Sequence, residues 1–216
     1  RYNDLVDYYT LWVHQIKTPI AASKLLVREV ADRQLKQQLE QEIFKIDSYT
    51  NLVLQYLRLE SFHDDLVLKK ENIEDLVKEV IRKYAIFFIQ KNLSINMHDL
   101  DRSIVTDKKW LLVVIEQILS NSLKYTNSGG IEIYMEDQEL CIKDTGIGIK
   151  NSDVLRVFER GFSGYNGRMT QQSSGLGLYL TQKISQELGH QIRIESELGQ
   201  GTTVRIKFAE VNLLIE

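Results

Sequence analysis

An aspartate followed by two spaced glycines is the first group of residues that could do chemistry. The stretch Asp144-Thr-Gly-Ile-Gly-Ile149 follows a strand-like run, so Gly146 and Gly148 would let the backbone bend closely around a flat ligand. The Asp144 carboxylate accepts hydrogen bonds, and the amino group of an adenine would fit that acceptor. The alternative is an ordinary turn with a capping aspartate, and this motif alone does not separate the two.

A second glycine-bearing segment leads into a helix-like run. In Ser173-Ser-Gly-Leu-Gly-Leu178, the residues Gly175, Leu176 and Gly177 stand where a helix begins. Free amide groups and the helix dipole favour phosphate at such a place. The segment is neither a GxxxxGK[ST] P-loop nor a Rossmann GxGxxG, so by itself it identifies no nucleotide-binding fold.

Polar residues spaced along an apolar helix form a third candidate. The run 116–125 places Gln117, Asn121 and Lys124 within about one turn of each other and ends at Tyr125. An amide oxygen can ligate Mg²⁺, and a lysine can meet phosphate. Each residue alone is more simply part of a solvated helix face, but the three at this spacing favour a site.

The segment 150–174 carries glycines and arginines and forms a fourth candidate. It contains Val157-Phe-Glu-Arg-Gly161, so Phe158 and Arg160 lie in it, with Arg168 further on. One interpretation is a mobile basic lid over a triphosphate. The other is an ordinary surface loop.

The elements that must position these residues change along the chain. All 12 glycines lie at or after Gly129 and the only proline is Pro19, so the first half suits long helices and regular strands. Residues 1–62 have apolar side chains at helical spacing, which predicts a helical hairpin whose turn falls within Arg33–Gln38. Two helices cannot enclose so wide an apolar stripe, so we expect a second copy and a dimeric four-helix bundle. The stripe consists of Leu5, Tyr9, Trp12, Ile16, Ile20, Val27, Leu39, Ile43, Ile46, Val53 and Leu57.

From about Asp65 the pattern becomes mixed, which predicts a second domain, 65–216, after a first domain of residues 1–62. Strands and helices without regular βαβ alternation indicate an α+β sandwich, with helices on one face of a mixed sheet. The expected strands cover 66–69, 93–97, 103–106, 131–136, 139–143, 191–197 and 202–208, and the expected helices cover 73–90, 108–125 and 177–188.

Composition excludes several classes of protein. With 27 basic and 30 acidic residues the net charge is −3, which argues against a protein that coats nucleic acid. The single cysteine, Cys141, cannot form an internal disulfide, and the four histidines lack the spacing of a metal site. No apolar run of about 18 residues could span a bilayer.

The four candidates occur in the order of the ATP-binding domain shared by sensor histidine kinases, gyrase, Hsp90 and MutL, and residues 65–208 resemble that domain. The resemblance implies an α+β sandwich in which Asn121 holds Mg²⁺ and Asp144 recognises adenine. Gln117 replaces both the asparagine common in the kinases and the glutamate that activates water in the ATPases. Without that general base, ATP hydrolysis should be slow, which favours phosphoryl transfer. The nucleotide contacts implied are Gln117, Asn121, Lys124, Tyr125, Asp144, Gly146, Gly148, Phe158, Arg160, Gly175, Leu176, Gly177 and Thr202.

The run Trp12-Val-His-Gln-Ile-Lys-Thr-Pro-Ile20 resembles the phosphoacceptor segment of the histidine kinase dimerisation domain. At 100° per residue, His14 lies roughly 150° from the centre of the apolar stripe, so we expect it to face solvent. An exposed helical histidine alone is usually a surface residue, but beside an ATP domain it is better read as a nucleophile. The resemblance implies that Thr18 orients water for dephosphorylation of the partner, and Gln15 stands where most members have Glu or Asp.

The sequence therefore predicts the cytoplasmic catalytic core of a sensor histidine kinase, which uses ATP and Mg²⁺ to phosphorylate His14 within a homodimer. The phosphoryl group would pass to the receiver domain of a response regulator, and no nucleic acid partner is expected. The segments 12–19 and 161–168 together also resemble kinases that sense antimicrobial peptides beside a transporter. This resemblance implies a membrane anchor in segments absent from this chain. Gln15 favours one alternative, an ATP-binding scaffold or degenerate kinase. A second alternative, an ATPase clamp, is disfavoured by the phosphoacceptor-like segment 12–20 and by Gln117.

Overall fold

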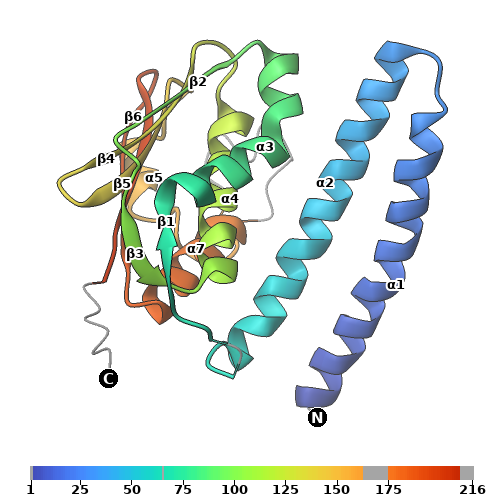
Figure 1. Cartoon of the computed structure of the whole chain (residues 1–216), viewed down its shortest axis with the longest axis horizontal. Coiled ribbons are helices and arrows are strands. Elements are labelled where there is room, and N and C mark those ends of the chain that lie inside the picture. The colour runs from blue at the N-terminus through green and yellow to red at the C-terminus, as the bar shows by residue number, and fades with distance from the viewer. Residues whose placement is uncertain (1, 65, 163–174, 210–216) are drawn as a thin grey trace. The chain divides into compact units, whose positions relative to one another are not determined.

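The computed structural model divides the chain into two compact units, Arg1–Asp65 and Leu66–Glu216 (Figure 1). It describes residues 2–64, 66–162 and 175–209. Each unit is described by itself below. No helix within these residues is both long and apolar enough to cross a membrane.

The first unit is a hairpin of two long helices, α1 (Tyr2–Arg28) and α2 (Arg33–Arg58), followed by the short 3₁₀ helix η1 (Leu59–Ser61) (Figure 1). The predicted hairpin is therefore present, but its predicted turn within Arg33–Gln38 is wrong, because α2 already begins at Arg33. The reason is the cap at Asp32, whose carboxylate accepts hydrogen bonds from the backbone N–H groups of Gln34 (2.8 Å) and Leu35 (3.0 Å).

Within a single copy, the apolar stripe of this hairpin is only partly covered. Ile20 and Val27 are buried. Trp12 and Ile46 remain 45% and 51% exposed, although they belong to the predicted stripe, and Tyr9 is also exposed. One hairpin therefore leaves a substantial apolar surface, as expected for two helices without a further layer.

The second unit is a five-stranded mixed sheet in the order β2-β4-β5-β7-β6, in which only β2 and β4 are parallel. Strands β1 and β3 form a separate two-stranded antiparallel sheet. The predicted strand at 66–69 is wrong, because the ladder with β3 pairs Lys69–Asn72 instead. The strands are β1 Lys69–Asn72, β2 Ser94–His98, β3 Ser103–Thr106, β4 Gly130–Glu136, β5 Glu139–Asp144, β6 Gln191–Glu197 and β7 Gly201–Lys207.

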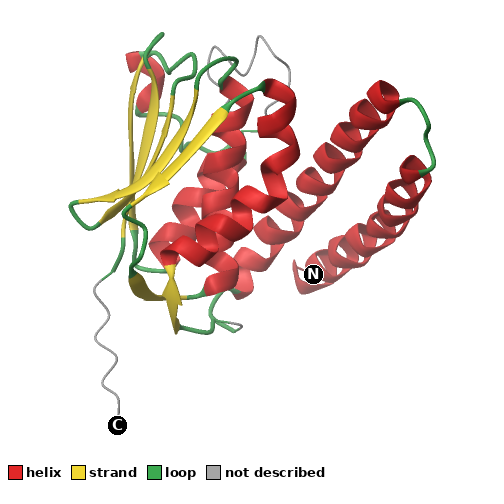
Figure 2. Ribbon diagram, turned by 45° about the horizontal axis from the view of Figure 1, so that its top comes forward, coloured by secondary structure: helices red, strands yellow, loops and turns green. Residues whose placement is uncertain are grey.

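The helices α3 (Ile73–Lys91), α4 (Lys108–Tyr125) and α7 (Gly177–Glu187) cover one face of the large sheet, and α5 (Asn151–Val154) is a single short turn (Figure 2). The predicted α+β sandwich is confirmed. Alternate residues of the strands point into this covered face and form the core with the helices. Fully buried examples are Ile131, Ile133, Leu140, Ile142 and Ile206.

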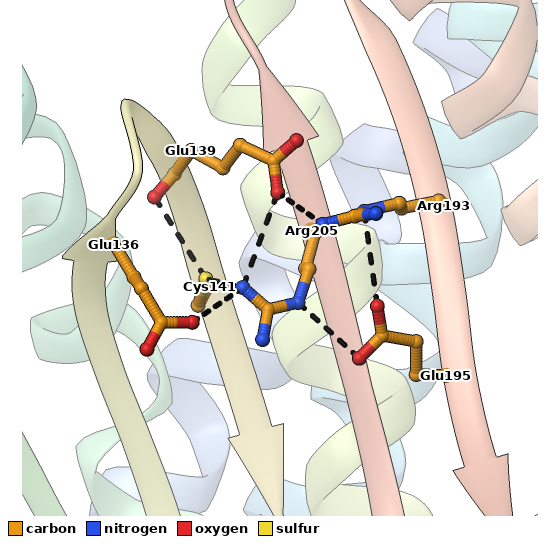
Figure 3. A network of polar contacts seen from close by, with 6 residues as sticks. All are labelled: Glu136, Glu139, Cys141, Arg193, Glu195 and Arg205. Carbon is orange, nitrogen blue, oxygen red and sulfur yellow. Dashed lines mark hydrogen bonds and ion pairs between the residues drawn. The ribbon is translucent and has the colours of Figure 1, made fainter.

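The other face of the sheet is open and charged. Arg205 of β7 lies at the centre of an ion-pair network (Figure 3), with its guanidinium 2.7 Å from Glu136 and 3.3 Å from Glu195. A guanidinium nitrogen also lies 3.9 Å from Glu139 and 3.2 Å from the sulfur of Cys141, which is fully buried. The network therefore joins four neighbouring strands across the open face.

Candidate nucleotide site and phosphoacceptor helix

Asp144, the last residue of β5, is buried on the covered face and is held by three hydrogen bonds. One carboxylate oxygen, Oδ1, accepts from the backbone N–H groups of Gly146 (2.9 Å) and Thr202 (3.1 Å). The other, Oδ2, accepts from the hydroxyl of Ser122 (3.0 Å), one turn before the end of α4. An ionised carboxylate has about four acceptor directions, so this geometry leaves one for a ligand.

Burial raises the pKa of the Asp144 carboxyl, and the hydrogen bonds from Gly146, Ser122 and Thr202 work against this rise. The three donors are neutral, so they orient the group without matching its charge. A donor from a ligand would complete its hydrogen bonding, which is what the amino group of an adenine could do.

Gly146 and Gly148 let the loop after β5 pack tightly against the rest of the protein. A Cβ at Gly146 would lie 2.7 Å from the carbonyl oxygen of Tyr125, and a Cβ at Gly148 would collide with the backbone of Glu197. Gly148 also has a positive φ of 68°. The sequence predicted that these glycines bring the backbone close to a ligand, and the structure shows that they bring it close to α4 and to the end of β6.

The glycine-bearing segment before α7 lies beside α4. A Cβ at Gly177 would be 2.8 Å from the side-chain oxygen of Gln117, so these two predicted residues are neighbours. The backbone N–H of Gly161 donates a hydrogen bond to the carbonyl oxygen of Gly175 (3.0 Å). This bond holds Gly161 next to the start of α7. Leu176 forms the N-cap of α7 without a side-chain hydrogen bond of its own to the helix. Arg168, Ser173 and Ser174 lie outside the described residues.

The remaining predicted residues differ in how far they are exposed. Asn121 precedes Ser122 on α4 and is half-buried, while burial lowers the pKa of Lys124, whose ammonium lies 5.0 Å from the centre of the Tyr125 ring. Phe158 is half-buried and Arg160 is exposed. A further arginine of the predicted lid, Arg156, is already engaged: it forms an ion pair with Glu159 (3.0 Å) and stacks on the ring of Phe162.

The residues of this site suit a magnesium ion only if phosphates and water supply most of its ligands. Among the described residues, no group of three or more His, Cys, Asp or Glu side chains could hold a metal. Mg²⁺ commonly takes one or two protein oxygens and completes its shell with phosphates and water. The amide oxygen of Asn121 can serve as such a ligand.

Two serines of the site were not found from the sequence. Ser122 falls on the buried side of α4, where a small polar residue gives no periodic signal, and Ser196 lies on β6, far from the motifs in the chain. The Ser196 hydroxyl accepts from the backbone N–H of Ile149 (2.8 Å) and lies 2.9 Å from that of Thr202. Only the pairing of β6 with β7 brings Ser196 to the loop after Asp144.

In the first unit, His14 is exposed on α1, as predicted, and so are Gln15 and Thr18. The Thr18 hydroxyl lies 3.5 Å from the carbonyl oxygen of His14, the outer limit of a hydrogen bond. Pro19 lies inside the helix and cannot donate to the carbonyl of Gln15, four residues earlier. The histidine is thus presented on a continuous helix just before a local weakness in its hydrogen bonding.

Comparisons with known proteins agree with this architecture. Residues 106–212 match the family of histidine kinase-, DNA gyrase B-, and HSP90-like ATPases. The chain is 36% identical over 211 residues to the sensor histidine kinase YxdK of Bacillus subtilis, covering 94% of this chain and 64% of the relative. It is 38% identical over 212 residues to the sensor protein kinase GraS of Staphylococcus aureus, with 96% and 61% covered.

The chain therefore spans less than two thirds of the length of these curated relatives. Among solved structures, full-length ShkA in complex with AMPPNP superimposes with a TM-score of 0.68, covering 93% of this chain and 45% of ShkA. At 22% identity, this likeness speaks for the fold alone. By these sequence matches, the second unit carries an ATPase domain of the histidine kinase, gyrase B and HSP90 type, and the chain as a whole is similar to the matching part of sensor histidine kinases.

Proposed function

We propose that this chain is the cytoplasmic catalytic core of a sensor histidine kinase, which phosphorylates His14 with ATP and passes the phosphoryl group to a response regulator. One combination supports this most: a buried acceptor, Asp144, with a free acceptor direction in the second unit, and an exposed histidine on a long helix in the first. Neither feature alone distinguishes a kinase from another ATP-binding protein. Together they supply a nucleotide site and a nucleophile.

In this proposal Asp144 accepts from the amino group of adenine, with Thr202 beside it, and Gly175, Leu176 and Gly177 lie along the phosphates at the start of α7. Lys124 and Arg160 contact phosphate oxygens. Asn121 would hold Mg²⁺, which neutralises charge on the phosphates when bound.

The transfer itself asks little of the protein beyond positioning. A ring nitrogen of neutral His14 attacks the γ-phosphorus, a nitrogen–phosphorus bond forms, and the bond from phosphorus to the bridging oxygen breaks, so that ADP leaves. The proton of the other ring nitrogen passes to solvent, since the side chain is exposed. An aspartate of the regulator then takes the phosphoryl group as the nitrogen–phosphorus bond breaks. Gln117 cannot act as a general base for water, so hydrolysis competes poorly.

The decisive experiment incubates the protein with γ-labelled ATP and follows acid-labile label on the chain. Wild type should become labelled, and His14→Ala should not. His63→Ala, a change at another exposed histidine of the same unit, is the matched control and should label as wild type does. Label on the His14→Ala variant would contradict the assignment of the nucleophile.

A second copy of the chain is part of the proposal. The exposed apolar side chains of the hairpin, among them Trp12 and Ile46, would be covered in a dimeric four-helix bundle. Light scattering should give a dimer, and Ile46→Glu should produce monomers. Leu155→Glu, at a 90% exposed leucine of the second unit, should leave the dimer intact. A wild-type monomer at micromolar concentration would rule the bundle out.

Gln15 favours the alternative of a scaffold that binds ATP and the regulator without efficient autophosphorylation. Glutamine can orient the imidazole through a hydrogen bond but cannot accept a proton or stabilise positive charge. For a kinase, Gln15→Glu should raise the rate of autophosphorylation by roughly 3- to 100-fold, while Thr18→Ala should leave that rate intact and impair dephosphorylation of the regulator. A wild-type protein that binds ATP and never labels His14 would support the scaffold.

The resemblance also supports a wider setting for this core: a membrane-anchored protein that works beside a transporter and responds to antimicrobial peptides. The names of YxdK and GraS describe both relatives as sensor kinases. Fractionation of cells, followed by co-purification of the anchored protein with its transporter, tests this setting. Recovery of the protein in the soluble fraction alone would contradict it.

A further inference from the structure

Thr202 lies between two polar side chains at one end of the sheet. In the register of the strands, Thr202 of β7 is opposite Asp144 of β5 on one side and opposite Ser196 of β6 on the other. Directly opposed residues of neighbouring strands point to the same face, so the three side chains form a row. The row begins at the acceptor of the proposed base site and ends at Ser196.

The hydroxyl of Ser196 makes three contacts. It accepts from the backbone N–H of Ile149 (2.8 Å), it donates to the carbonyl oxygen of Gly201 (2.8 Å), and it lies 2.9 Å from the hydroxyl of Thr202. A carbonyl can only accept, so the single proton of Ser196 is used on Gly201. The third contact is then a hydrogen bond only if Thr202 donates its proton to Ser196. The proton of Thr202 is then engaged by Ser196, so the Thr202 hydroxyl can offer a ligand only the lone pairs of its oxygen.

We propose that Ser196 is a positioning residue that fixes the Thr202 hydroxyl as an acceptor, so that the base site selects 6-aminopurine over 6-oxopurine nucleotides. This inference rests on the proposed function, which puts Asp144 and Thr202 beside the base. An ionised Asp144 is also an acceptor only. Two neighbouring acceptors match an amino group, or a water that donates twice, and they repel a carbonyl oxygen. A Thr202 hydroxyl released from Ser196 could turn and donate to that oxygen.

Titration calorimetry with ATP and inosine triphosphate tests the proposal, because these nucleotides differ in the group at position 6. Wild type should bind ATP more tightly. We express this preference as the dissociation constant for inosine triphosphate divided by that for ATP. Ser196→Ala should lower this ratio roughly tenfold, the effect of one hydrogen bond that changes from mismatched to matched. Ser196→Thr keeps the hydroxyl and should keep the ratio within about twofold of wild type. If Ser196→Ala weakens both nucleotides equally, Ser196 only supports the loop and the proposal fails.

Thr202→Val makes the test independent of the folding of Ser196→Ala. It removes the hydroxyl that Ser196 orients, so it should lower the ratio by itself, and adding Ser196→Ala should change the ratio no further. A ratio in Thr202→Val equal to that of wild type would overturn the proposal. Ser185→Ala is the matched control: the Ser185 hydroxyl is buried on α7 and has no hydrogen-bond partner among the described residues. It should leave both affinities unchanged.

The outcomes also separate this inference from the function on which it rests. A wild-type protein that binds no ATP overturns both. A wild-type protein that binds ATP and inosine triphosphate with equal affinity overturns the inference about Ser196 and leaves the ATP-binding kinase standing.

Discussion

Asp144 and Arg205 are charged residues on the two faces of one sheet, and the protein supports them in different ways. Asp144, on the covered face, receives three hydrogen bonds from neutral donors. Arg205, on the open face, is surrounded by the carboxylates of Glu136, Glu139 and Glu195 (Figure 3). Burial raises the pKa of Asp144, while the hydrogen bond that Arg205 donates to Glu136 raises the pKa of Arg205.

The difference separates a binding site from a structural network. The positive charge of Arg205 is balanced by ion pairs with neighbouring carboxylates, so it contributes to the stability of the fold. Asp144 is oriented but not neutralised, so folding keeps an unfavourable buried charge whose remaining hydrogen bond is open to a ligand. Substitution at the two positions should therefore have opposite signatures: loss of binding without loss of stability at Asp144, and the reverse at Arg205.

The largest effect is expected for Asp144→Asn. The amide cannot keep every acceptor direction of the carboxylate, so ATP affinity should fall by about 1.5–3 kcal/mol, the range for a hydrogen bond to a charged group. The free energy of unfolding should stay the same or rise, because a buried charge is removed. Calorimetry with ATP and urea denaturation measure the two quantities. The exposed Asp101→Asn is the control, and unchanged ATP affinity in Asp144→Asn would remove that residue from the site.

The two histidines of the second unit, His98 and His190, extend the comparison to the pH dependence of stability. His190 is buried between Thr106, whose hydroxyl is 3.1 Å away, and the backbone N–H of Ala209, and burial lowers its pKa to about 4. The unfolded chain takes up a proton below about pH 6.5, before the folded protein does, so stability is complete above that pH and is lost as the pH falls toward 4. Between pH 7.5 and 5 the loss should be about 2 kcal/mol.

His98 supplies the control with the opposite sign. It stacks on Tyr134 on the open face and contacts Asp99 (2.9 Å) and Glu132 (3.2 Å), and the hydrogen bonds to these carboxylates raise its pKa. Its contribution is present at low pH and is lost as the pH rises. In urea denaturation, His190→Asn should flatten the acid loss of stability, and His98→Gln should steepen it. A His190→Asn variant with the acid slope of wild type would contradict the buried neutral histidine.

The sequence predicted what depends on local patterns and missed what depends on strand pairing. Helix α4 and the two strands expected at 131–136 and 139–143 were correct, because apolar spacing and a two-residue connection are local signals. The two connecting residues, Asp137 and Gln138, both have positive φ. Ser122 and Ser196 were missed because their partners lie 22 and 47 residues away along the chain. The strand expected at 66–69 was misplaced because its apolar residues precede the ladder that β3 defines.

A smaller effect is expected for Arg205→Gln on the open face. Removing the guanidinium leaves three carboxylates without their shared partner, so the free energy of unfolding should fall by about 1 kcal/mol, and less in 1 M salt, which screens exposed charges. ATP affinity should not change. Arg193→Gln, at the more exposed arginine of the same network, should cost only a few tenths of a kcal/mol. A drop in ATP affinity for Arg205→Gln would break the proposed division between the two faces.

The smallest effect concerns Cys141, which the same guanidinium covers. The thiol is fully buried, burial raises its pKa, and a guanidinium nitrogen of Arg205 lies 3.2 Å from the sulfur. A thiolate is the reactive form, so the native protein should react slowly with a thiol reagent at neutral pH. Arg205→Ala opens the sulfur to solvent and also removes a neighbouring positive charge that favours the thiolate. The first effect should win, because a reagent cannot attack a sulfur that it cannot reach. Labelling should therefore speed up by roughly 2- to 10-fold, well short of the rate in urea. Equal rates in wild type and variant would mean that the sheet itself, and not Arg205, shields the thiol.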